Sequence, residues 1–275
     1  MLRMLDDVYL IKFGGNAISG KADLDRLSRE IAALIHDNAK IVLVHGGGPE
    51  INVELEKKGI VPVKVAGQRI TDDATLEVAE SVLKKINTDV VESLKVAGVT
   101  AIGVPGYFVI ECVKKMPITV TENGEEITVD LQNVGDIVSV DVETIEDLLR
   151  GGVTPVIYPI GASSDMKHLN INADTMAASI ATNIKCMEMI QITDVPGIML
   201  DVKDPSSKQD ILTLTEVDKL IADGVITGGM IPKVDACRNA LNAGVAKVRM
   251  VNGKDPRSII SNVKGSAEHG TIITK

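Results

Sequence analysis

The stretch from Lys40 to Glu50, K-I-V-L-V-H-G-G-G-P-E, decides how the rest of the chain is interpreted. Four apolar residues, 41–44, follow one another without alternation, which is typical of a strand buried on both faces in a parallel sheet. Three glycines, Gly46 to Gly48, then bring bare backbone to the carboxyl end of that strand, where open α/β sheets bind ligands. From Pro49 the pattern is helical, so free N–H groups and a helix N-terminus would face one point, which suits an anion. A tight turn without a ligand is the alternative, but a single glycine would serve that purpose.

The composition limits what the chain can bind. It has 275 residues, of which 45% are hydrophobic and only 2% aromatic, and its formal net charge is −9. A chain of this length holds one large α/β domain or two lobes. The acidic balance argues against nucleic acid as a partner, because a phosphate backbone requires a basic surface. Any anion must therefore be bound locally, by a few Lys, Arg and backbone N–H groups.

The cysteines and histidines indicate neither a disulfide framework nor a zinc site. The three cysteines, Cys112, Cys186 and Cys237, are far apart and form no CxxC pair, which favours reduced thiols in a cytoplasmic protein. The four histidines lack zinc-ligand spacing, and His45, directly before the glycines, is expected to be a structural hydrogen bonder. The N-terminus lacks a signal pattern and no apolar run approaches the ~18 residues of a membrane span. We therefore expect a soluble cytoplasmic protein with no membrane contact.

The first part of the chain predicts a βαβ unit. A short apolar strand over residues 7–13 contains Lys12 and is closed by Gly14 and Gly15. A helix over 23–38, with Asp23 as its expected N-cap, leads to the Lys40 strand, and this order implies a right-handed crossover. Further elements are expected at 50–58 (helix), 61–70 (hairpin turning at Ala66-Gly67), from Thr71 or Asp72 toward 96 (helix) and 100–104 (strand).

Residues 107–138 differ in character from the rest of the chain. Their alternating segments are separated by Asn123-Gly124, a two-residue hairpin signal, so we predict an antiparallel flap attached to the parallel sheet. The remaining elements are expected at 141–149, 175–184, 215–223, 233–243 and 255–263 (helices) and at 154–160, 187–193, 247–251 and 270–274 (strands). The change in character places a soft boundary near Gly161, between an N-terminal lobe, 1–161, and a C-terminal lobe, 162–275.

Glycine loops, two lysines and one aspartate together indicate phosphoryl transfer. Lys12 and Lys233 each stand beside a glycine pair, and Asp174 lies in a loop that could place it between them. A migrating phosphoryl group needs positive charge and N–H donors around its oxygens, and little covalent help. A carboxylate between the lysines would hold both ammonium groups by charge-assisted hydrogen bonds. Mg²⁺ would bridge the nucleotide phosphates and need few protein ligands.

The segment N-I-N-A-D, residues 170–174, leaves two interpretations open. If it is extended, Asn170, Asn172 and Asp174 project to the same side and form part of a site. Alternatively they are an N-cap cluster for the helix that follows, although Asp174 alone would do for that. The common nucleotide motifs, GxxxxGK[ST] and a GxGxxG after a strand, are missing, so hydride transfer with a dinucleotide loses support.

Six motifs, in order, resemble those of a known family. They are K-F-G-G-N-A (12–17), H-G-G-G-P-E-I-N (45–52), G-Q-R-I-T-D (67–72), N-I-N-A-D (170–174), T-D-V-P-G-I (193–198) and T-G-G-M-I-P-K (227–233). Over nearly the whole chain the sequence resembles the amino acid kinase family, and within it the members that phosphorylate N-acetylglutamate. The resemblance implies a three-layer α/β/α sandwich around a mainly parallel sheet. It also implies transfer of a phosphoryl group from ATP, with Mg²⁺, to the side-chain carboxylate of N-acetyl-L-glutamate, which gives N-acetyl-L-glutamyl 5-phosphate in arginine biosynthesis.

The resemblance also implies roles for individual residues. Lys12 and Lys233 would stabilise the transferring phosphoryl group, and Asp174 would orient them. Arg69 would pair with the α-carboxylate of the substrate, while Asn170 and Asn172 would hold its α-carboxylate and amide side. The glycines Gly14, Gly15, Gly46 and Gly47 would give N–H donors to phosphate and substrate. The acyl amino acid site would take Gly46, Gly47 and Gly48, and the nucleotide site would take Gly14, Gly15, Thr193, Asp194, Gly197, Gly228 and Gly229.

Two features depart from the family pattern. After the 100–104 strand the family usually has Ser-Gly-x-Asp, where this chain has Val104-Pro105-Gly106-Tyr107, which leaves the fit of the acyl group open. Only a short segment precedes Lys12, whereas the arginine-inhibited members of the family, which look hexameric, carry a longer N-terminal helix there. A homodimer without arginine feedback is therefore expected. The alternatives are another amino acid kinase, acting on aminoadipate carried on a protein or on aspartate, and a non-catalytic small-molecule binding protein of the same fold. Retention of both lysines argues against the last of these.

Overall fold

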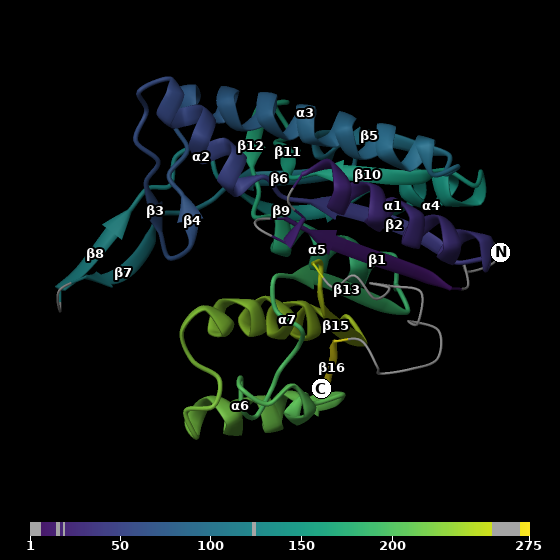
Figure 1. The fold of residues 1–275 in the computed structure, drawn as a ribbon. Helices are drawn as coiled ribbons and strands as arrows, with labels where there is room; N and C mark the ends of the chain where they lie inside the picture. The colour runs from purple at the N-terminus through teal and green to yellow at the C-terminus, as the bar shows by residue number, and fades with distance from the viewer. Residues whose placement is uncertain (1–6, 15–16, 19, 123–124, 255–269) are drawn as a thin grey trace.

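The structure is a computed structural model that describes residues 7–14, 17–18, 20–122, 125–254 and 270–275. Its centre is a mainly parallel sheet (Figure 1), which confirms the predicted fold class. In spatial order the strands are β14 (Ile211–Thr213), β16 (Thr271–Thr274), β15 (Lys247–Asn252), β13 (Glu188–Thr193), β1 (Val8–Phe13), β2 (Lys40–His45), β10 (Thr154–Tyr158) and β5 (Ala101–Pro105). Only β16 and β14, at one end, run against the direction of the other strands in this described sheet.

Helices cover both faces of the sheet, which makes the three layers. The helices are α1 (Lys21–His36), α2 (Gly48–Lys57), α3 (Asp73–Val96), α4 (Val142–Arg150), α5 (Ala173–Asn183), α6 (Leu214–Ala222) and α7 (Ile231–Ala243), with short 3₁₀ turns η2 (Gly106–Phe108), η3 (Pro205–Ser207) and η4 (Gly228–Met230). One face packs against α1 and α3, and the other against α4, α5 and α7. β1 is buried on both sides because its side chains alternate between these two cores.

The expected flap is antiparallel, but its strands lie in two smaller sheets and not in the parallel sheet. Its strands are β6 (Ile110–Lys114), β7 (Ile118–Glu122), β8 (Glu125–Val129) and β9 (Gly135–Val140); β6 pairs with β9, and β7 pairs with β8. Together with β11 (Ile160–Ala162) and β12 (His168–Asn170), β6 and β9 form a four-stranded sheet, whereas β7 and β8 form a two-stranded sheet of their own. The segment predicted as one strand over 154–160 therefore divides between the parallel sheet and this second sheet. The hairpin turn at Asn123-Gly124 lies outside the described residues. A small hairpin, β3 (Lys64–Val65) and β4 (Gln68–Arg69), turns at Ala66-Gly67 as predicted.

Helix ends show where sequence reasoning identified a cap and where it did not. Asp72 caps α3 as expected, because its side chain accepts a hydrogen bond from the Thr75 N–H at 2.7 Å. The prediction of Asp23 as a cap is wrong, since α1 begins two residues earlier, after Gly20, which has a φ of 86°. Asp23 instead lies in the first turn and pairs with Arg26. The predicted helix over 255–263 falls outside the described residues.

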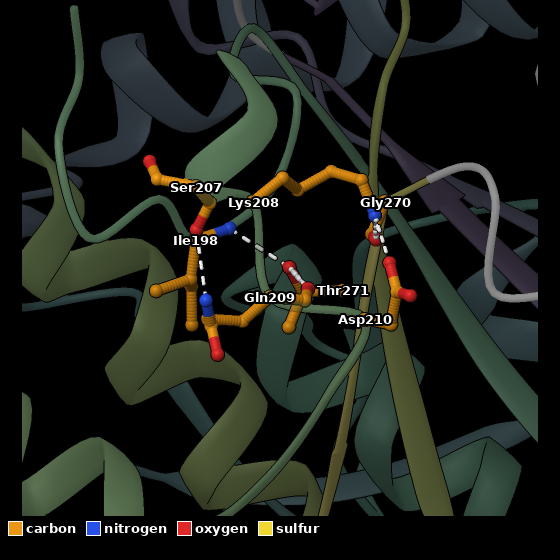
Figure 2. A network of polar contacts seen from close by, with 7 residues as sticks. All are labelled: Ile198, Ser207, Lys208, Gln209, Asp210, Gly270 and Thr271. Atoms are coloured by element: carbon orange, nitrogen blue, oxygen red, sulfur yellow. Dashed lines mark hydrogen bonds and ion pairs between the residues drawn. The ribbon is translucent and has the colours of Figure 1, made fainter. Parts of the chain in front are cut away.

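A polar network anchors the end of the sheet that contains β16 (Figure 2). The buried Thr271 hydroxyl accepts from the Ile198 N–H at 2.8 Å and donates to the Gln209 carbonyl at 2.7 Å. Lys208 Nζ donates to the Gly270 carbonyl at 2.9 Å. These bonds attach the loop after β13 to the start of β16. No helix in the described part of the chain is both long and apolar enough to cross a membrane.

Candidate active site

Lys12 and Asp174 form the ion pair at the centre of the site. On β1, Val8 and Leu10 face the core that contains α5, and strand alternation places Lys12 on the same side. Asp174 lies in the first turn of α5, and its Oδ1 is 2.7 Å from Lys12 Nζ. The Lys12 side chain is only 11% exposed. The strand therefore holds one ammonium group at the edge of the sheet, against a carboxylate from the next layer.

Gln191 is a third member of this group that the sequence analysis missed. It lies opposite Lys12 in the parallel pairing of β13 with β1, and its Nε2 donates to Asp174 Oδ1 at 2.8 Å. Burial acts to raise the pKa of Asp174, but the charge of Lys12 and the hydrogen bonds from Lys12 and Gln191 outweigh it and lower that pKa. Asp174 therefore stays ionised near neutral pH. A polar residue within the apolar strand 188–193 was the available signal.

Lys233 is paired with a different carboxylate from the one predicted. Its Nζ is 2.8 Å from Asp194 Oδ1, and the two side chains are 26% and 40% exposed. The hydrogen bond from Lys233 is the main cause of the lowered pKa of Asp194. Lys233 stands in the first turn of α7 and Asp194 directly follows β13, so they meet at the carboxyl edge of the sheet. The expectation that Asp174 holds both lysines is therefore wrong in this structure.

Both ion pairs nevertheless line one cavity of about 270 Å³. Its lining includes Lys12, Gly14, Asp174, Gln191, Thr193, Asp194 and Lys233. The predicted convergence of the two lysines from distant parts of the sequence is thus present. The cavity brings together two ammonium groups and two ionised carboxylates, a charge pattern that suits a phosphate chain whose own charges displace the carboxylates from the lysines.

Gly14 and Gly47 are the described glycines of the two loops after β1 and β2 that leave little room for a side chain. A Cβ on Gly14 would lie 3.1 Å from the Gly46 Cα, and one on Gly47 would lie 2.7 Å from Ile86 Cδ1. The Gly46 N–H already donates to the Phe13 carbonyl at 2.9 Å, because strand pairing continues one residue beyond β2. The expectation that Gly46 gives its N–H to a ligand is therefore wrong here. Gly47 and Gly48 are the N-cap and first residue of α2, where N–H groups have no intrahelical partner.

His45 supports this loop from below, as predicted for a structural hydrogen bonder. It is fully buried, its Nδ1 lies 2.9 Å from the Gly46 carbonyl, and its Nε2 lies 3.1 Å from Asn87 Nδ2. A neutral imidazole with the proton on Nδ1 satisfies both contacts, since Nδ1 then donates and Nε2 accepts. Burial lowers the pKa of His45 to about 4, so it is no acid or base at neutral pH.

Arg69 lines a second cavity, of about 140 Å³, that begins at the glycine loop. Its Nη2 donates to Asn52 Oδ1 at 2.5 Å and to the Gly48 carbonyl at 3.2 Å. Its Nη1 is buried without a hydrogen-bond partner, and among the described residues no carboxylate pairs with Arg69. Burial lowers the pKa of Arg69, but a guanidinium stays charged. A buried cation with a free N–H face is a site for an anion.

Asn170 and Asn172 also line the Arg69 cavity, but they make different hydrogen bonds. Asn172 is the N-cap of α5, where its Oδ1 accepts from the N–H groups of Asp174 and Thr175. Asn170 Nδ2 donates to the Thr71 hydroxyl at 3.1 Å. The side-chain NH₂ group of Asn172 can thus donate to a ligand, and the side-chain oxygen Oδ1 of Asn170 can accept from one. The N-cap of α5 is therefore Asn172 and not Asp174, and a role of this segment in a ligand site stays a prediction.

The remaining residues assigned to the nucleotide site either do not line the cavity of the two lysines or make contacts that stabilise the backbone. Gly197, with a φ of 132°, packs its backbone against Thr271, and neither Gly228 nor Gly229 lines the cavity of the two lysines or that of Arg69. Thr193 lines the larger cavity, while its hydroxyl accepts from the Val195 N–H. Gly15 lies outside the described residues.

All three cysteines are free and buried, as expected. Burial raises the pKa of Cys112 to about 11 and that of Cys186 and Cys237 to about 12. They are protonated at neutral pH, so a thiolate nucleophile has no place in this chemistry.

Comparison with known proteins identifies the family. The model of the amino acid kinase family matches residues 7–252. The chain belongs to the amino acid kinase family. It is 40% identical to the acetylglutamate kinase of Methanococcus vannielii, over 98% of this chain and 92% of that protein, and 41% identical to that of Methanocaldococcus jannaschii, over 98% and 90%. The family relationship confirms that this chain is a kinase.

Solved structures of other proteins share the fold of this chain. The carbamate kinase of Giardia superposes with a TM-score of 0.66 at 17% identity, over 98% of this chain and 99% of that one. An N-acetylglutamate synthase from Neisseria gonorrhoeae gives a TM-score of 0.76 at 22% identity, over 99% of this chain and 60% of that one. At these identities the likeness concerns the fold alone. The fold is therefore shared by proteins with different named activities.

Proposed function

We propose that this amino acid kinase transfers the γ-phosphoryl group of ATP to the side-chain carboxylate of N-acetyl-L-glutamate, giving ADP and N-acetyl-L-glutamyl 5-phosphate for arginine biosynthesis. The observation that carries the proposal is the pairing of two cavities. One contains a buried guanidinium with an unpartnered N–H face, and the other two lysines paired with carboxylates. The relatives named acetylglutamate kinase support this choice of acceptor.

The polar side chains that line the smaller cavity match the groups of the acceptor. Its α-carboxylate pairs with Arg69, whose Nη1 is the free donor there. Asn172 donates from its NH₂ group, and the Asn170 carbonyl oxygen accepts the N–H of the acetamido group. The side-chain carboxylate then points toward Gly47 and Gly48, at the N-terminus of α2. A carboxylate is already ionised at neutral pH, so the enzyme needs no general base.

The transfer step needs charge more than covalent chemistry. A carboxylate oxygen of the acceptor forms a bond to the γ-phosphorus as the bond between that phosphorus and the β,γ-bridging oxygen breaks, and ADP leaves with the electron pair. Lys12 and Lys233 stabilise the negative charge spread over the phosphoryl oxygens. Asp174 keeps the Lys12 ammonium in place. The N–H groups at the start of α2 and the backbone at Gly14 surround the same oxygens.

The donors at the larger cavity fit a magnesium nucleotide. Among the described residues no group of three or more His, Cys, Asp or Glu could hold a metal ion by itself. Asp174 and Asp194 are the carboxylates at this edge, and both are committed to lysines. Mg²⁺ would thus be held mainly by the phosphates, with Asp194 as the candidate protein contact, and it would neutralise charge on the β- and γ-phosphates.

The two predicted lobes divide the substrates between them. We assign the acyl amino acid to residues 1–161 and ATP to 162–275. Residues 170–173 are the contribution of the second lobe to the acceptor cavity, and Lys12 and Gly14 are that of the first lobe to the nucleotide cavity. Association as a homodimer and a cytoplasmic location remain predictions. Light scattering coupled to gel filtration would decide the first of these.

One assay tests the proposed function. ADP release is measured with acetylglutamate, glutamate, aspartate and aminoadipate, each at saturating ATP and Mg²⁺. We expect turnover with acetylglutamate to exceed that with the other three by at least about a hundredfold, because only it presents both an α-carboxylate and an acetamido group to Arg69 and Asn170. Faster turnover with aminoadipate would support the other amino acid kinase, and no turnover with any of them would support a binding protein.

A further inference from the structure

We infer that Gln191 is a positioning residue for phosphoryl transfer: it holds the Asp174 carboxylate that in turn fixes the Lys12 ammonium group. This inference rests on the proposed function of the site. Gln191 touches Asp174 and not the transferring group, so it acts through its neighbour. By holding Asp174, it determines the position of the Lys12 ammonium group during phosphoryl transfer.

The geometry defines a three-membered chain of contacts. Asp174 Oδ1 accepts from Lys12 Nζ at 2.7 Å and from Gln191 Nε2 at 2.8 Å, so one oxygen receives both bonds. Lys12 and Gln191 are register partners on adjacent parallel strands, β1 and β13. Asp174 comes from α5, in the layer above. Two strands and a helix thus meet at one carboxylate, whose position is fixed from two directions.

The orientation of the Gln191 amide follows from chemistry. If Oε1 and Nε2 were exchanged, two oxygen atoms would face each other across the 2.8 Å contact with Asp174, which is unfavourable. The NH₂ group must therefore face the carboxylate. Gln191 is 5% exposed, and its Oε1 is buried without a hydrogen-bond partner among the described residues. An unpaired buried acceptor is rare in an ordinary core, and Gln191 is also one of the residues that line the larger cavity.

The position also argues against a merely structural role. Met189, two residues earlier on the same side of β13, packs in the hydrophobic core with α5 and α7. A hydrophobic residue at 191 would continue that core and would avoid the cost of burying an amide. Asp174 has one donor from Lys12 already, so folding alone does not require a second. The amide is explained by its effect on the Asp174–Lys12 pair.

The experiment compares two variants of almost unchanged volume. Gln191→Met removes the donor, and Gln191→Glu replaces it with a carboxyl group. Ser28→Ala is the matched control, because Ser28 is a buried polar residue that donates to Ser93 at 2.9 Å, away from both cavities. For Gln191→Met we expect kcat to fall about 10- to 30-fold, with the KM values for ATP and acceptor within about twofold of wild type, since a hydrogen bond to a charged group is lost. For Ser28→Ala we expect kcat to be unchanged.

The pH dependence of Gln191→Glu separates positioning from structure. A protonated Glu can donate to Asp174 as the amide does, whereas an ionised one repels it. The ratio of kcat for Gln191→Glu to that of wild type should therefore rise as pH falls from 8 to 6. The charged or titratable groups that face Asp174 from neighbouring elements are Lys12 on β1, Asp194 after β13, Lys233, Asp235 and Cys237 on α7, and Lys115 and Asp136 beside the second sheet. They are the same in both proteins and cancel in the ratio.

A second readout needs no turnover. Titration of the Asp174 carboxyl by carbon-13 NMR in the free enzyme, assigned with Asp174→Asn, should show a higher pKa in Gln191→Met than in wild type. A wild-type protein that fails to phosphorylate acetylglutamate would overturn the proposed function and leave this titration valid. An active wild type, with unchanged kcat in Gln191→Met, a flat ratio in Gln191→Glu and an unchanged Asp174 pKa, would overturn the inference.

Discussion

The two lysines of the larger cavity are held in different ways. Lys12 stands on a central strand, is nearly buried and is paired with a carboxylate that Gln191 also binds. Lys233 stands at the start of a helix, is more exposed, and is paired with Asp194, which is itself 40% exposed. The first ammonium group is therefore preorganised by the sheet. The second must exchange a carboxylate for a phosphate oxygen when the nucleotide binds, and an exposed pair is weak enough to allow that exchange.

Loss of either lysine should have the largest effect, on turnover. Lys12→Met and Lys233→Met should each lower kcat by about a thousandfold, because each removes a positive charge from the transferring group. The comparison predicts a difference in stability. Lys12→Met should lower the free energy of unfolding by about 1–2 kcal/mol, since it leaves the partly buried Asp174 without its cationic partner, whereas Lys233→Met should change it by less than about 0.5 kcal/mol.

Kinetics and urea denaturation of both variants measure this contrast, with wild type as reference. Equal losses of stability in the two variants would contradict the difference in how the lysines are held. Near-normal turnover of Lys233→Met would show that Lys233 is not a catalytic residue.

The acceptor cavity offers the next largest effect. Arg69→Ala should raise the KM for acetylglutamate about a hundredfold and leave the KM for ATP within about twofold, because Arg69 lines the other cavity and its free Nη1 is the expected partner of the α-carboxylate. Arg69→Lys, which keeps the charge but loses the fork of donors, should recover only part of the loss. Steady-state kinetics with each substrate varied in turn is the measurement. A similar rise in both KM values would show that the cavities do not separate the substrates.

His45 should make the glycine loop sensitive to acid. Its folded pKa, about 4, lies below its value of 6.5 in the unfolded chain, so the unfolded state binds a proton first as pH falls. The contribution of the neutral imidazole to stability is complete above about pH 6.5 and is lost as pH falls toward 4. By pH 5 the loss should reach about 2 kcal/mol.

His45→Gln is the control for this effect, because it lacks the titrating ring. Urea denaturation between pH 7.5 and 5 should give a shallower decline in its free energy of unfolding than in that of wild type. The two proteins are compared by the slope of the free energy of unfolding against pH and not by its absolute value, since His45→Gln should also be less stable at neutral pH. Parallel slopes would mean that the buried imidazole does not titrate in this range.

The smallest effect should come from Asp194. Asp194→Asn should change the free energy of unfolding by less than about 0.5 kcal/mol, because its ion pair is exposed. Asp174→Asn, the matched variant, should cost about 1–2 kcal/mol, because Lys12 is nearly buried and would lose its anionic partner. Thermal denaturation of the pair of variants is sufficient. A larger loss for Asp194→Asn would reverse the assignment of fixed and exchangeable lysines.

Much of this arrangement could be predicted from the sequence, because it depends on local patterns. The run at 41–44, the glycines after it and the position of Lys12 near the end of β1 place a charged side chain at the carboxyl edge of a parallel sheet. Strand alternation then decides which face Lys12 occupies. The six motifs extend this to the family, which the comparisons confirm.

The choice between equivalent partners could not be predicted. Two carboxylates lie at the same sheet edge, and a sequence does not say that Lys233 takes Asp194 and leaves Asp174 to Lys12. Nor does it reveal that the Gly46 N–H is consumed by strand pairing with Phe13, because that depends on register. Gln191 was overlooked for a similar reason. Its role depends on the residue opposite it on β1, far away in the sequence.

The position of β16 has a consequence for how the protein is made. This strand, at 271–274, lies between β14 and β15, and its neighbour β14 was formed by residues 211–213. As the chain leaves the ribosome, β14 emerges well before the one strand to which it bonds in the described sheet. The strands that carry Lys12 and the glycine loop emerge first and are each other's neighbours. The acceptor side can therefore assemble during translation, while the edge beyond β15 must wait for the last residues of β16.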